Sequence, residues 1–362
     1  SMKTSDEPLL ALSMGDPAGI GPEIIVKAWV EDPATMAHCC VAGDWAVMQR
    51  AVDICRAKLP AELAGRVPQL RSVSAWQSAH QIGTDCIPVL QACQTDSEPP
   101  AWGQVQRQAG QMAAECIETA AKAALQGQCA GLVTAPIHKE ALSAAGVPYP
   151  GHTEMLQALA AQHQGVSIDA MPVRMMLANT ELRTVLNSIH ISLRDAIEAV
   201  TFDNLLQTIQ ITHAFLLQQE FVQTANRQPI IAVAGLNPHA GESGLFGREE
   251  IDIINPAIAA ARQHGMDVRG PFPPDTVFMT AREQAHAQPP FCDAVIAMYH
   301  DQGLIPVKYL GVQHGVNVTL GLPLLRTSPD HGTAFNLAGT AQADSKSLLE
   351  AVRIGLRMAS RA

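Results

Sequence analysis

Short apolar runs typical of β-strands alternate with helical stretches along all 362 residues of the chain. Residues 9–14 and 230–234 are two of these runs, and a glycine-containing turn follows each. Strands that alternate with helices form parallel sheets that are covered by helices. The pattern therefore predicts an α/β fold, and the length allows two domains.

Turn and capping residues place further elements. Pro22 suits the first turn of a helix that follows GDPAGIG, while Asn255 with Pro256 and then Gly265 mark the start and end of another. The segment 60–100 is rich in Gln, Ser and Pro, and we expect an irregular, peripheral excursion there. Further helices are expected over residues 104–126, 156–164, 193–219 and 345–360, and strands over 173–177, 183–186 and 294–298.

The composition narrows the class of protein. A net charge of −10 argues against nucleic-acid binding, which needs a basic surface. No apolar run approaches the ~20 residues of a membrane helix, and Ser1 before Met2 resembles an expression scar with no signal peptide after it. The eight cysteines show no CxxC and no disulfide spacing, so we expect reduced thiols in a cytoplasmic protein.

Three histidines each follow an apolar run: His190 after TVLN, His239 after IIAVA and His300 after AVIAM. Ligands of open α/β sheets bind at the carboxyl ends of the strands, so the three side chains could converge. Three imidazoles that leave one position open form a Lewis-acid metal site. The spacings of 49 and 61 residues match no motif, and with 13 histidines in the chain the alternative is structural or surface histidines.

The stretch 298–334 also carries two cations beside apolar runs, Lys308 and Arg326, in a chain with only 24 Lys and Arg residues. An Arg fork, an ammonium and the amide of Asn317 would hold a phosphate or carboxylate. The alternative is an exposed lysine and a structural arginine. His152 and Thr153 in YPGHTEM could donate to the same ligand or cap the helix that follows.

Other polar residues lie near these segments. Asp301 beside His300, and Asp275 in PFPPDT, could bind the metal, orient an imidazole or cap a helix. We take Asp275, Asp301 and Lys308 as the candidate catalytic residues. His138 in APIHKE, with the lysine that follows it, could take part in proton transfer or start a helix. The loop DHGTAFNLAG places His, Thr, Asn and Gly before the last helix.

Taken together, these segments resemble the family of 4-hydroxythreonine-4-phosphate dehydrogenases of the PdxA type. The strings MGDPAGIGPE, VTAPIHK, GHTE, LNPHAGE, MYHDQG, VNVTLGLP and RTSPDHGTA occur in that family's order, and the resemblance covers nearly the whole chain. It implies a divalent metal at a dimer interface on His190, His239 and His300. It also implies substrate contacts from His152, Thr153, Lys308, Asn317 and Arg326.

The resemblance implies a fold similar to that of isopropylmalate and isocitrate dehydrogenases, with two α/β/α domains flanking a cleft. We expect residues 1–135 with 309–362 to form the nucleotide-binding domain, and 136–308 to form the metal and dimer domain. An HGTA-like sequence cradles the adenosine half of the nicotinamide cofactor in those relatives. The candidate cofactor contacts are His331, Gly332, Thr333 and Asn336.

The implied function is metal-dependent, NAD(P)-linked oxidation and decarboxylation of an anionic β-hydroxy acid by a homodimer with a shared active site. The expected reaction converts 4-phosphohydroxy-L-threonine to 3-amino-2-oxopropyl phosphate in pyridoxal phosphate biosynthesis. Zinc is the expected metal, with cobalt, manganese, nickel and magnesium as alternatives, and both NAD and NADP stay open.

Three other functions stay open: a cis-dihydrodiol carboxylate dehydrogenase of the terephthalate type, a threonate-4-phosphate dehydrogenase, and a non-catalytic ligand-binding protein. Two segments depart from the family pattern. The 60–100 region is longer, and residues 160–171 are extra after the GHTE turn, which leaves the substrate in doubt.

Overall fold

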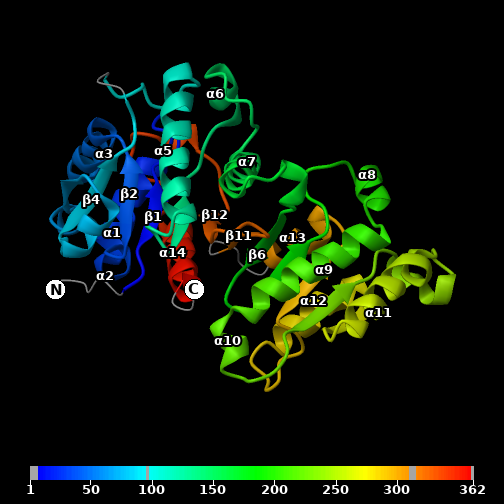
Figure 1. Ribbon diagram of the computed structural model, residues 1–362. Coiled ribbons are helices and arrows are strands. Elements are labelled where there is room, and N and C mark those ends of the chain that lie inside the picture. Colours follow the sequence, from blue (N-terminus) through cyan, green and yellow to red (C-terminus); the bar gives the residue numbers. More distant parts are fainter. Residues whose placement is uncertain (1–6, 95–97, 310–314, 360–362) are drawn as a thin grey trace. The chain divides into compact units, whose positions relative to one another are not determined.

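The computed structural model describes residues 7–94, 98–309 and 315–359 (Figure 1). Residues 95–97, 310–314 and 360 of the predicted segments lie outside the described residues. The chain divides into two compact units, one made of Ser1–Pro172 with Leu322–Ser360 and the other of Val173–Gly321. The boundaries fall later than those expected at 135 and 308, because helices after residue 135 still pack on the first unit.

The first unit has a sheet of six parallel strands in the order β3-β4-β2-β1-β5-β12. Its strands are β1 (Leu10–Ser13), β2 (Cys39–Gly43), β3 (Gln69–Val73), β4 (Cys86–Gln91), β5 (Gly131–Thr134) and β12 (Arg326–Pro329). Its helices are α1 (Gly21–Glu31), α2 (Pro33–Met36), α3 (Trp45–Lys58), α4 (Ala61–Ala64), α5 (Arg107–Leu125), α6 (Lys139–Ala144), α7 (His152–Gln164) and α14 (Lys346–Ala359), with 3-10 turns at Trp76–Gln81, Ile168–Ala170 and Phe335–Leu337.

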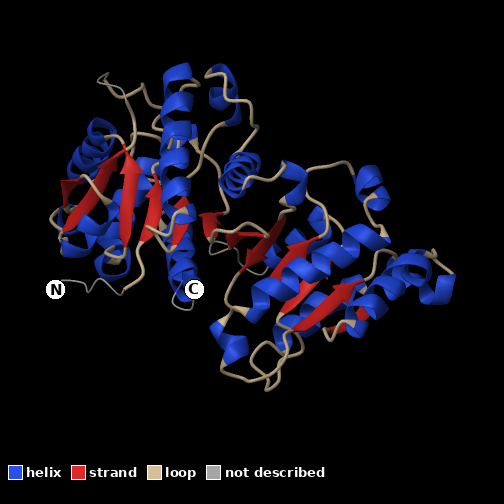
Figure 2. Ribbon diagram, in the orientation of Figure 1, coloured by secondary structure: helices blue, strands red, loops and turns tan. Residues whose placement is uncertain are grey.

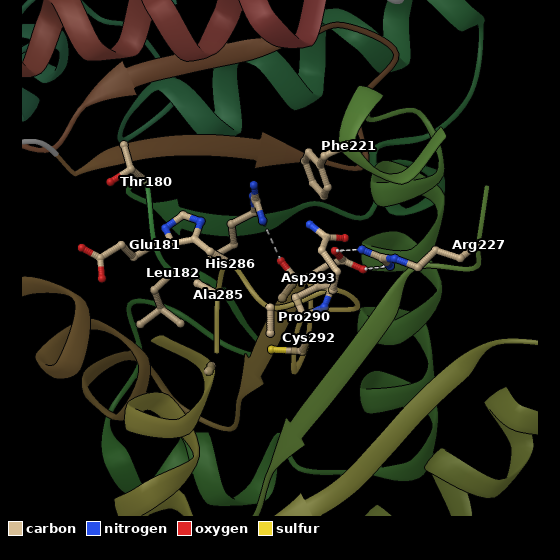
Figure 3. Close-up of a pocket in the computed structure, with 15 residues that line it drawn as sticks. Thr180, Glu181, Leu182, Phe221, Arg227, Ala285, His286, Pro290, Cys292 and Asp293 are labelled. Carbon is tan, nitrogen blue, oxygen red and sulfur yellow. Dashed lines mark hydrogen bonds and ion pairs between the residues drawn. The ribbon is translucent and has the colours of Figure 1, made fainter. Parts of the chain in front are cut away.

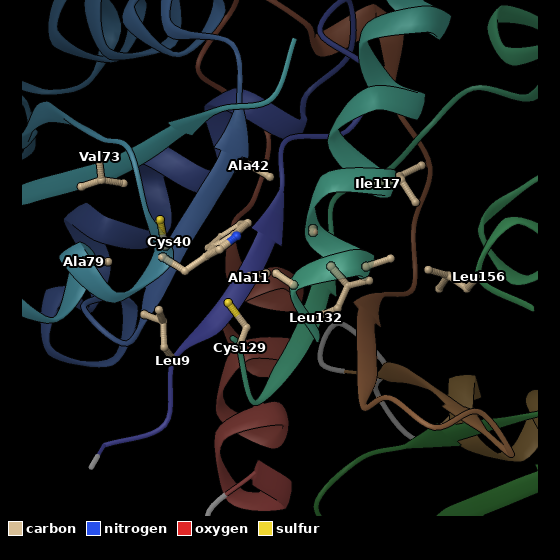
Figure 4. Packing of buried hydrophobic residues seen from close by; sticks show 14 of the residues in the cluster. Leu9, Ala11, Cys40, Ala42, Val73, Ala79, Ile117, Cys129, Leu132 and Leu156 are labelled. Atoms are coloured by element: carbon tan, nitrogen blue, oxygen red, sulfur yellow. The ribbon is translucent and has the colours of Figure 1, made fainter. Parts of the chain in front are cut away.

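Successive side chains of β1 point to opposite faces of the sheet, and helices pack on each face. Ala11 packs in one core cluster with Ile117 of α5 and Leu156 of α7 (Figure 4). Leu10 points the other way and lies against Gly355 of α14. Because successive side chains of a strand face opposite sides of the sheet, helices bury both faces.

The expectation of an irregular excursion at 60–100 was wrong. Strands β3 and β4 form one edge of the first sheet, and Val73 and Trp76 are buried in its core. Pro88 lies inside β4, where proline ordinarily argues against a strand. By contrast, the extra residues 160–171 form the last turns of α7 and a 3-10 turn, with Met171 packed on this helix.

The second unit has a mixed sheet in the order β11-β6-β7-β10-β8-β9, in which β6 runs antiparallel to both neighbours (Figure 2). Its strands are β6 (Arg174–Ala178), β7 (Arg183–Leu186), β8 (Ile230–Ala234), β9 (Asp267–Phe272), β10 (Ala294–Ala297) and β11 (Val316–Leu320). Its helices are α8 (Leu193–Glu198), α9 (Phe202–Leu217), α10 (Glu220–Gln223), α11 (Asn255–Gln263), α12 (Pro274–Glu283) and α13 (His300–Tyr309), with a 3-10 segment at Pro238–Gly244 and a π-helical turn at Glu250–Ile254.

Helices also cover the second sheet. Phe278 of α12 and Leu304 of α13 share a core cluster with Val295 of β10, while α9 contacts strands of the same sheet and packs on α11. The predicted α/β fold is therefore confirmed, with one antiparallel strand that the sequence pattern did not reveal. None of the helices within the described residues is long and apolar enough to cross a membrane.

Candidate functional site

The three predicted metal ligands follow the carboxyl ends of β7, β10 and β8, which are adjacent parallel strands of the second unit. The rings of His190 and His300 come together, with centroids 5.6 Å apart. His239 lies in the loop after β8, where its ring and that of Phe246 pack in a T shape with centroids 5.9 Å apart. Within the described part of a single chain, no three His, Cys, Asp or Glu side chains form a metal-binding group.

Carboxylates orient two of these imidazoles. Nδ1 of His300 is 2.7 Å from Oδ1 of Asp301, and Nδ1 of His239 is 3.1 Å from Oε2 of Glu242. A neutral imidazole that donates from Nδ1 to a carboxylate presents Nε2 as a ligand. This donor set fits a divalent metal of the zinc type, and it gives Asp301 an orienting role.

Two side chains hold the loops in place. Gln302 accepts from the backbone N–H of Met298 at 2.7 Å and donates to the carbonyl of Gly235 at 2.9 Å, so it links the His300 loop to the loop that carries His239. Asn187 accepts from the hydroxyl of Thr208 at 2.8 Å and fixes the start of the His190 loop. These bonds position the candidate ligands without touching a metal.

A glycine allows the helix that begins at His300 to approach the sheet. A Cβ built on Gly303 would lie 2.6 Å from Leu186 Cδ2 and 2.9 Å from Ala297 Cβ. We expect Gly303→Ala to lower the free energy of unfolding by about 1–3 kcal/mol, because the packed core must shift.

Urea denaturation of Gly303→Ala checks this expectation. Gly65→Ala is the matched control, since its Cβ would meet only ordinary contacts of 3.7 Å or more. If the two variants were equally stable, α13 would have space for a methyl group at residue 303, and the expectation would be wrong.

Arg326 lies at the start of β12 and is 6% exposed. Its Nε and Nη2 donate to the hydroxyl oxygen of Thr134 at 3.1 and 2.9 Å. Burial lowers the pKa of Arg326 to about 10, although Glu154 nearby opposes the shift, so the side chain stays a cation at neutral pH. A guanidinium has five N–H donors in a planar fork, which suits a phosphate or carboxylate.

His152 and Thr153 occupy the first turn of α7, in the same unit as Arg326. Nε2 of His152 is buried and has no hydrogen-bond partner. Burial and the charge of Arg326 lower the pKa of His152 well below 6.5, so the ring is neutral. Neither residue makes a side-chain cap of the helix.

Three predicted residues belong to the second unit. Lys308 is exposed in the last turn of α13, Asn317 lies in β11, and Asp275 is exposed in the first turn of α12. Thr134 and Glu154 were not predicted. Thr134 could have been found, because it is the last residue of an apolar strand and such positions line ligand sites.

The candidate cofactor loop joins β12 to α14. His331, Gly332 and Asn336 are exposed, and a Cβ on Gly332 would meet open space. Thr333 is buried instead, and its carbonyl accepts from the N–H of Ile20 at 3.0 Å. Three of the four predicted contacts are thus accessible to a ligand, while Thr333 fastens the loop to the GDPAGIG turn.

Two buried polar atoms lie beside this loop. Oδ1 of Asp16 accepts from the N–H of Ala18 at 2.8 Å, but Oδ2 has no partner. Nδ1 of His138 also has none, and its ring stacks on Phe335 with centroids 4.7 Å apart. Unpaired buried polar atoms are costly, so this corner fits a ligand rich in hydroxyl or amide groups.

Burial raises the pKa of Asp16 to about 6, and the Ala18 N–H and His138 oppose the shift. Since this value is above the ordinary 3.8, the folded protein binds more protons than the unfolded chain between about pH 4 and pH 6. The resulting contribution to stability is lost as the pH rises through that window.

Asp16→Asn should therefore be more stable than the unmodified protein at pH 8, by about 1–3 kcal/mol, and equally stable at pH 4. Denaturant unfolding at both pH values tests this. An equal difference at pH 4 and pH 8 would contradict it.

The second unit also contains a cavity of about 220 Å³ at the amino ends of β7 and β10 (Figure 3). Asp293 on its wall accepts from both Nη atoms of Arg227 at 2.7 and 2.9 Å. The strand ends that carry the histidines are the opposite, carboxyl ends. None of the predicted site residues lines this cavity, so it is not the candidate site.

Comparison with known proteins decides the family. The family model described as "Pyridoxal phosphate biosynthetic protein PdxA" matches residues 35–355. A 4-hydroxythreonine-4-phosphate dehydrogenase of Beijerinckia indica is 49% identical over 98% of this chain and 95% of its own length. The chain belongs to the PdxA family.

Other relatives include dehydrogenases named for other substrates. The D-threonate 4-phosphate dehydrogenase of Salmonella typhimurium is 42% identical, with 97% of this chain and 98% of its own length aligned. A crystal structure of 4-hydroxythreonine-4-phosphate dehydrogenase from Klebsiella pneumoniae is 40% identical, covers 98% of both chains and has a TM-score of 0.84. A terephthalate 1,2-cis-dihydrodiol dehydrogenase from Burkholderia xenovorans is 28% identical over 97% of this chain and 98% of its own, with a TM-score of 0.63. All are dehydrogenases by name, and this PdxA chain is an oxidoreductase acting on CH–OH.

Proposed function

We propose that this PdxA protein oxidises 4-phosphohydroxy-L-threonine with NAD(P)⁺ and releases 3-amino-2-oxopropyl phosphate after decarboxylation. The observation that carries the proposal is the buried cation Arg326 with the neutral, unpartnered His152 in the same unit. A buried guanidinium beside an imidazole that can donate a hydrogen bond matches the charge and geometry of a phosphate. The names of the relatives at 42–49% identity support the same substrate class.

The proposed phosphate contacts are Arg326, His152 and Thr153, and Lys308 and Asn317 are further candidate substrate contacts. Lys308 is also the candidate for moving the alcohol proton, with Asp275 and Asp301 as the other candidates. His190, His239 and His300 would hold a divalent metal, zinc by its all-imidazole ligands, which would polarise the alcohol oxygen, and a bound nicotinamide would accept the hydride.

We infer that the cofactor contacts the loop of His331, Gly332 and Asn336, because these residues are exposed and the unpaired atoms of Asp16 and His138 lie beside them. Lys27 contacts the same β12–α14 loop, where its Nζ donates to the carbonyls of Ala341 and Ala343, so both NAD and NADP stay candidates.

A second copy of the chain completes the proposed metal site. Large exposed apolar side chains flank the histidines: Leu245 and Phe246 follow His239, and Ile305 lies on the helix of His300. Large exposed apolar residues on one unit favour a protein interface. We propose a homodimer in which the partner subunit's His239 joins His190 and His300 of this chain.

The thiols support a cytoplasmic location. The sulfur atoms of Cys93 and Cys116 lie 3.7 Å apart, at hydrogen-bond rather than disulfide distance. A reducing compartment keeps such neighbours as thiols.

Two relatives suggest other substrates, D-threonate 4-phosphate and a terephthalate dihydrodiol. The first shares the phosphate, so Arg326 does not separate it from the leading candidate. The dihydrodiol dehydrogenase is a more distant relative at 28% identity.

Turnover of all three substrates, measured with NAD⁺ and with NADP⁺ before and after chelation, tests the proposal. We expect the phosphorylated hydroxy-amino acid to have the highest kcat/KM and chelation to abolish turnover. Preference for the dihydrodiol, or activity indifferent to chelation, would overturn it.

A further inference from the structure

The loop that carries His239 has an unusual backbone. His239, Ala240, Glu242 and Ser243 all have positive φ, between 46° and 56°, and Gly241 between them has a φ of 83°. Left-handed backbone is strained for a residue with a Cβ, so such runs persist only where the surroundings fix them.

Glu250 follows this loop in the sequence, and its side chain, which is 2% exposed, is enclosed by the loop. Its Oε2 accepts from the backbone N–H groups of Leu236 and Asn237 at 2.7 and 2.8 Å. Its Oε1 accepts from Nδ2 of Asn237 at 2.9 Å. Three hydrogen bonds from one loop compensate the burial of the carboxylate, and they tie the loop to the π-helical turn that begins at Glu250.

The carboxylate also fills the space under the left-handed turn. A Cβ on Gly241 would lie 2.7 Å from Oε1 of Glu250, and a Cβ on Gly235 would lie 3.2 Å from Oε2. The loop thus wraps around the carboxylate on two sides. Asn237 extends the contact, since its Nδ2 also donates to Glu249 at 2.7 Å.

We propose that Glu250 is a positioning residue for the metal site: its buried carboxylate holds residues 235–244 in the left-handed conformation that presents His239. This inference rests on the proposed role of His239 as a metal ligand. Glu250 itself touches neither metal nor substrate. Glu242 then orients the ring through Nδ1, and Gln302 links the same loop to the helix of His300.

Glu250→Gln is the central test, because the amide keeps the shape but can accept on one side only. Its NH₂ group would face the NH₂ of Asn237. We expect Zn²⁺ to bind about 10- to 100-fold more weakly, the range typical when an orienting partner of a ligand is lost. The matched control is Asp252→Asn, an exposed carboxylate on the same turn that pairs with Arg248, and it should bind Zn²⁺ normally.

A second variant separates hydrogen bonding from general damage. In Glu249→Gln/Glu250→Gln, Asn237 can rotate its amide so that Oδ1 accepts from both glutamines. We expect the double variant to recover most of the Zn²⁺ affinity lost in Glu250→Gln. A double variant weaker than the single one would contradict the hydrogen-bonded clamp.

Two measurements distinguish failure of this inference from failure of the proposed function. Hydrogen exchange in the metal-free protein should show faster exchange of the Leu236 and Asn237 amides in Glu250→Gln than in Asp252→Asn. His239→Ala should lose Zn²⁺ binding, and if it does not, the metal assignment is wrong whatever Glu250 does. If His239→Ala loses Zn²⁺ while Glu250→Gln keeps both normal affinity and slow exchange, the inference about Glu250 is overturned.

Discussion

His300→Ala should lose its bound divalent metal and lower kcat by about 10³-fold or more, since Lewis-acid stabilisation is worth several kcal/mol. The side chain begins α13 and its ring faces that of His190 at 5.6 Å between centroids. Its Nδ1 is held by Asp301, so removing the ring leaves that carboxylate on the surface, where it causes little strain. Metal content by elemental analysis and steady-state turnover check this expectation.

Stability provides the internal control for that variant. Asp301 is exposed, so the melting temperature of metal-free His300→Ala should match that of the metal-free unmodified protein within a few degrees. His286→Ala removes an exposed histidine at the distant cavity and should keep metal and turnover. Full metal content in His300→Ala would remove this residue from the site.

Arg326→Met should lower kcat/KM for the phosphorylated substrate by about 10²- to 10³-fold, because the loss of one partner of a buried charged pair costs about 3–5 kcal/mol. The change should appear mainly in KM if the contact holds the phosphate equally throughout the reaction. The free energy of unfolding of the substrate-free variant should be measured alongside, because the substitution also removes the two hydrogen bonds that Arg326 donates to Thr134.

Arg353→Met is the matched control for Arg326. It lies in the same unit on α14 and pairs with Asp32 and Glu350 at the surface. We expect normal kcat/KM and a loss of free energy of unfolding of less than about 1 kcal/mol. If Arg326→Met keeps its KM but unfolds easily, the arginine is a structural residue of the first core.

The order of strands and helices followed from the sequence because apolar runs and turn residues are local signals. Pro22 lies in the first turn of α1 as predicted, and the helix predicted from Asn255 begins there. The prediction for residues 60–100 was wrong because Pro88 and many polar residues obscured the signal of β4 and of the edge strand β3. The boundary near residue 135 failed to coincide with the observed one because the packing of α6 and α7 on α5 is a long-range contact.

In the candidate site too, local signals could be predicted from the sequence and long-range contacts could not. Parallel strands deliver His190 and His300 to one end of the sheet, so that convergence follows from strand order alone. Arg326 and Thr134 meet across 192 residues, and no local pattern encodes such a pair. Glu250 was not predicted as a site residue, because acidic residues near the start of a helix are ordinarily exposed in its first turn.

The most direct test of the shared metal site is to mix two inactive variants, His239→Ala and His300→Ala, unfold and refold them together, and measure turnover. A site built from His190 and His300 of one chain with the partner subunit's His239 would be intact once in each mixed dimer. We expect roughly a quarter of normal activity, since half of the dimers would be mixed and each would hold one good site. No recovery, with mixed dimers shown to form, would contradict the account.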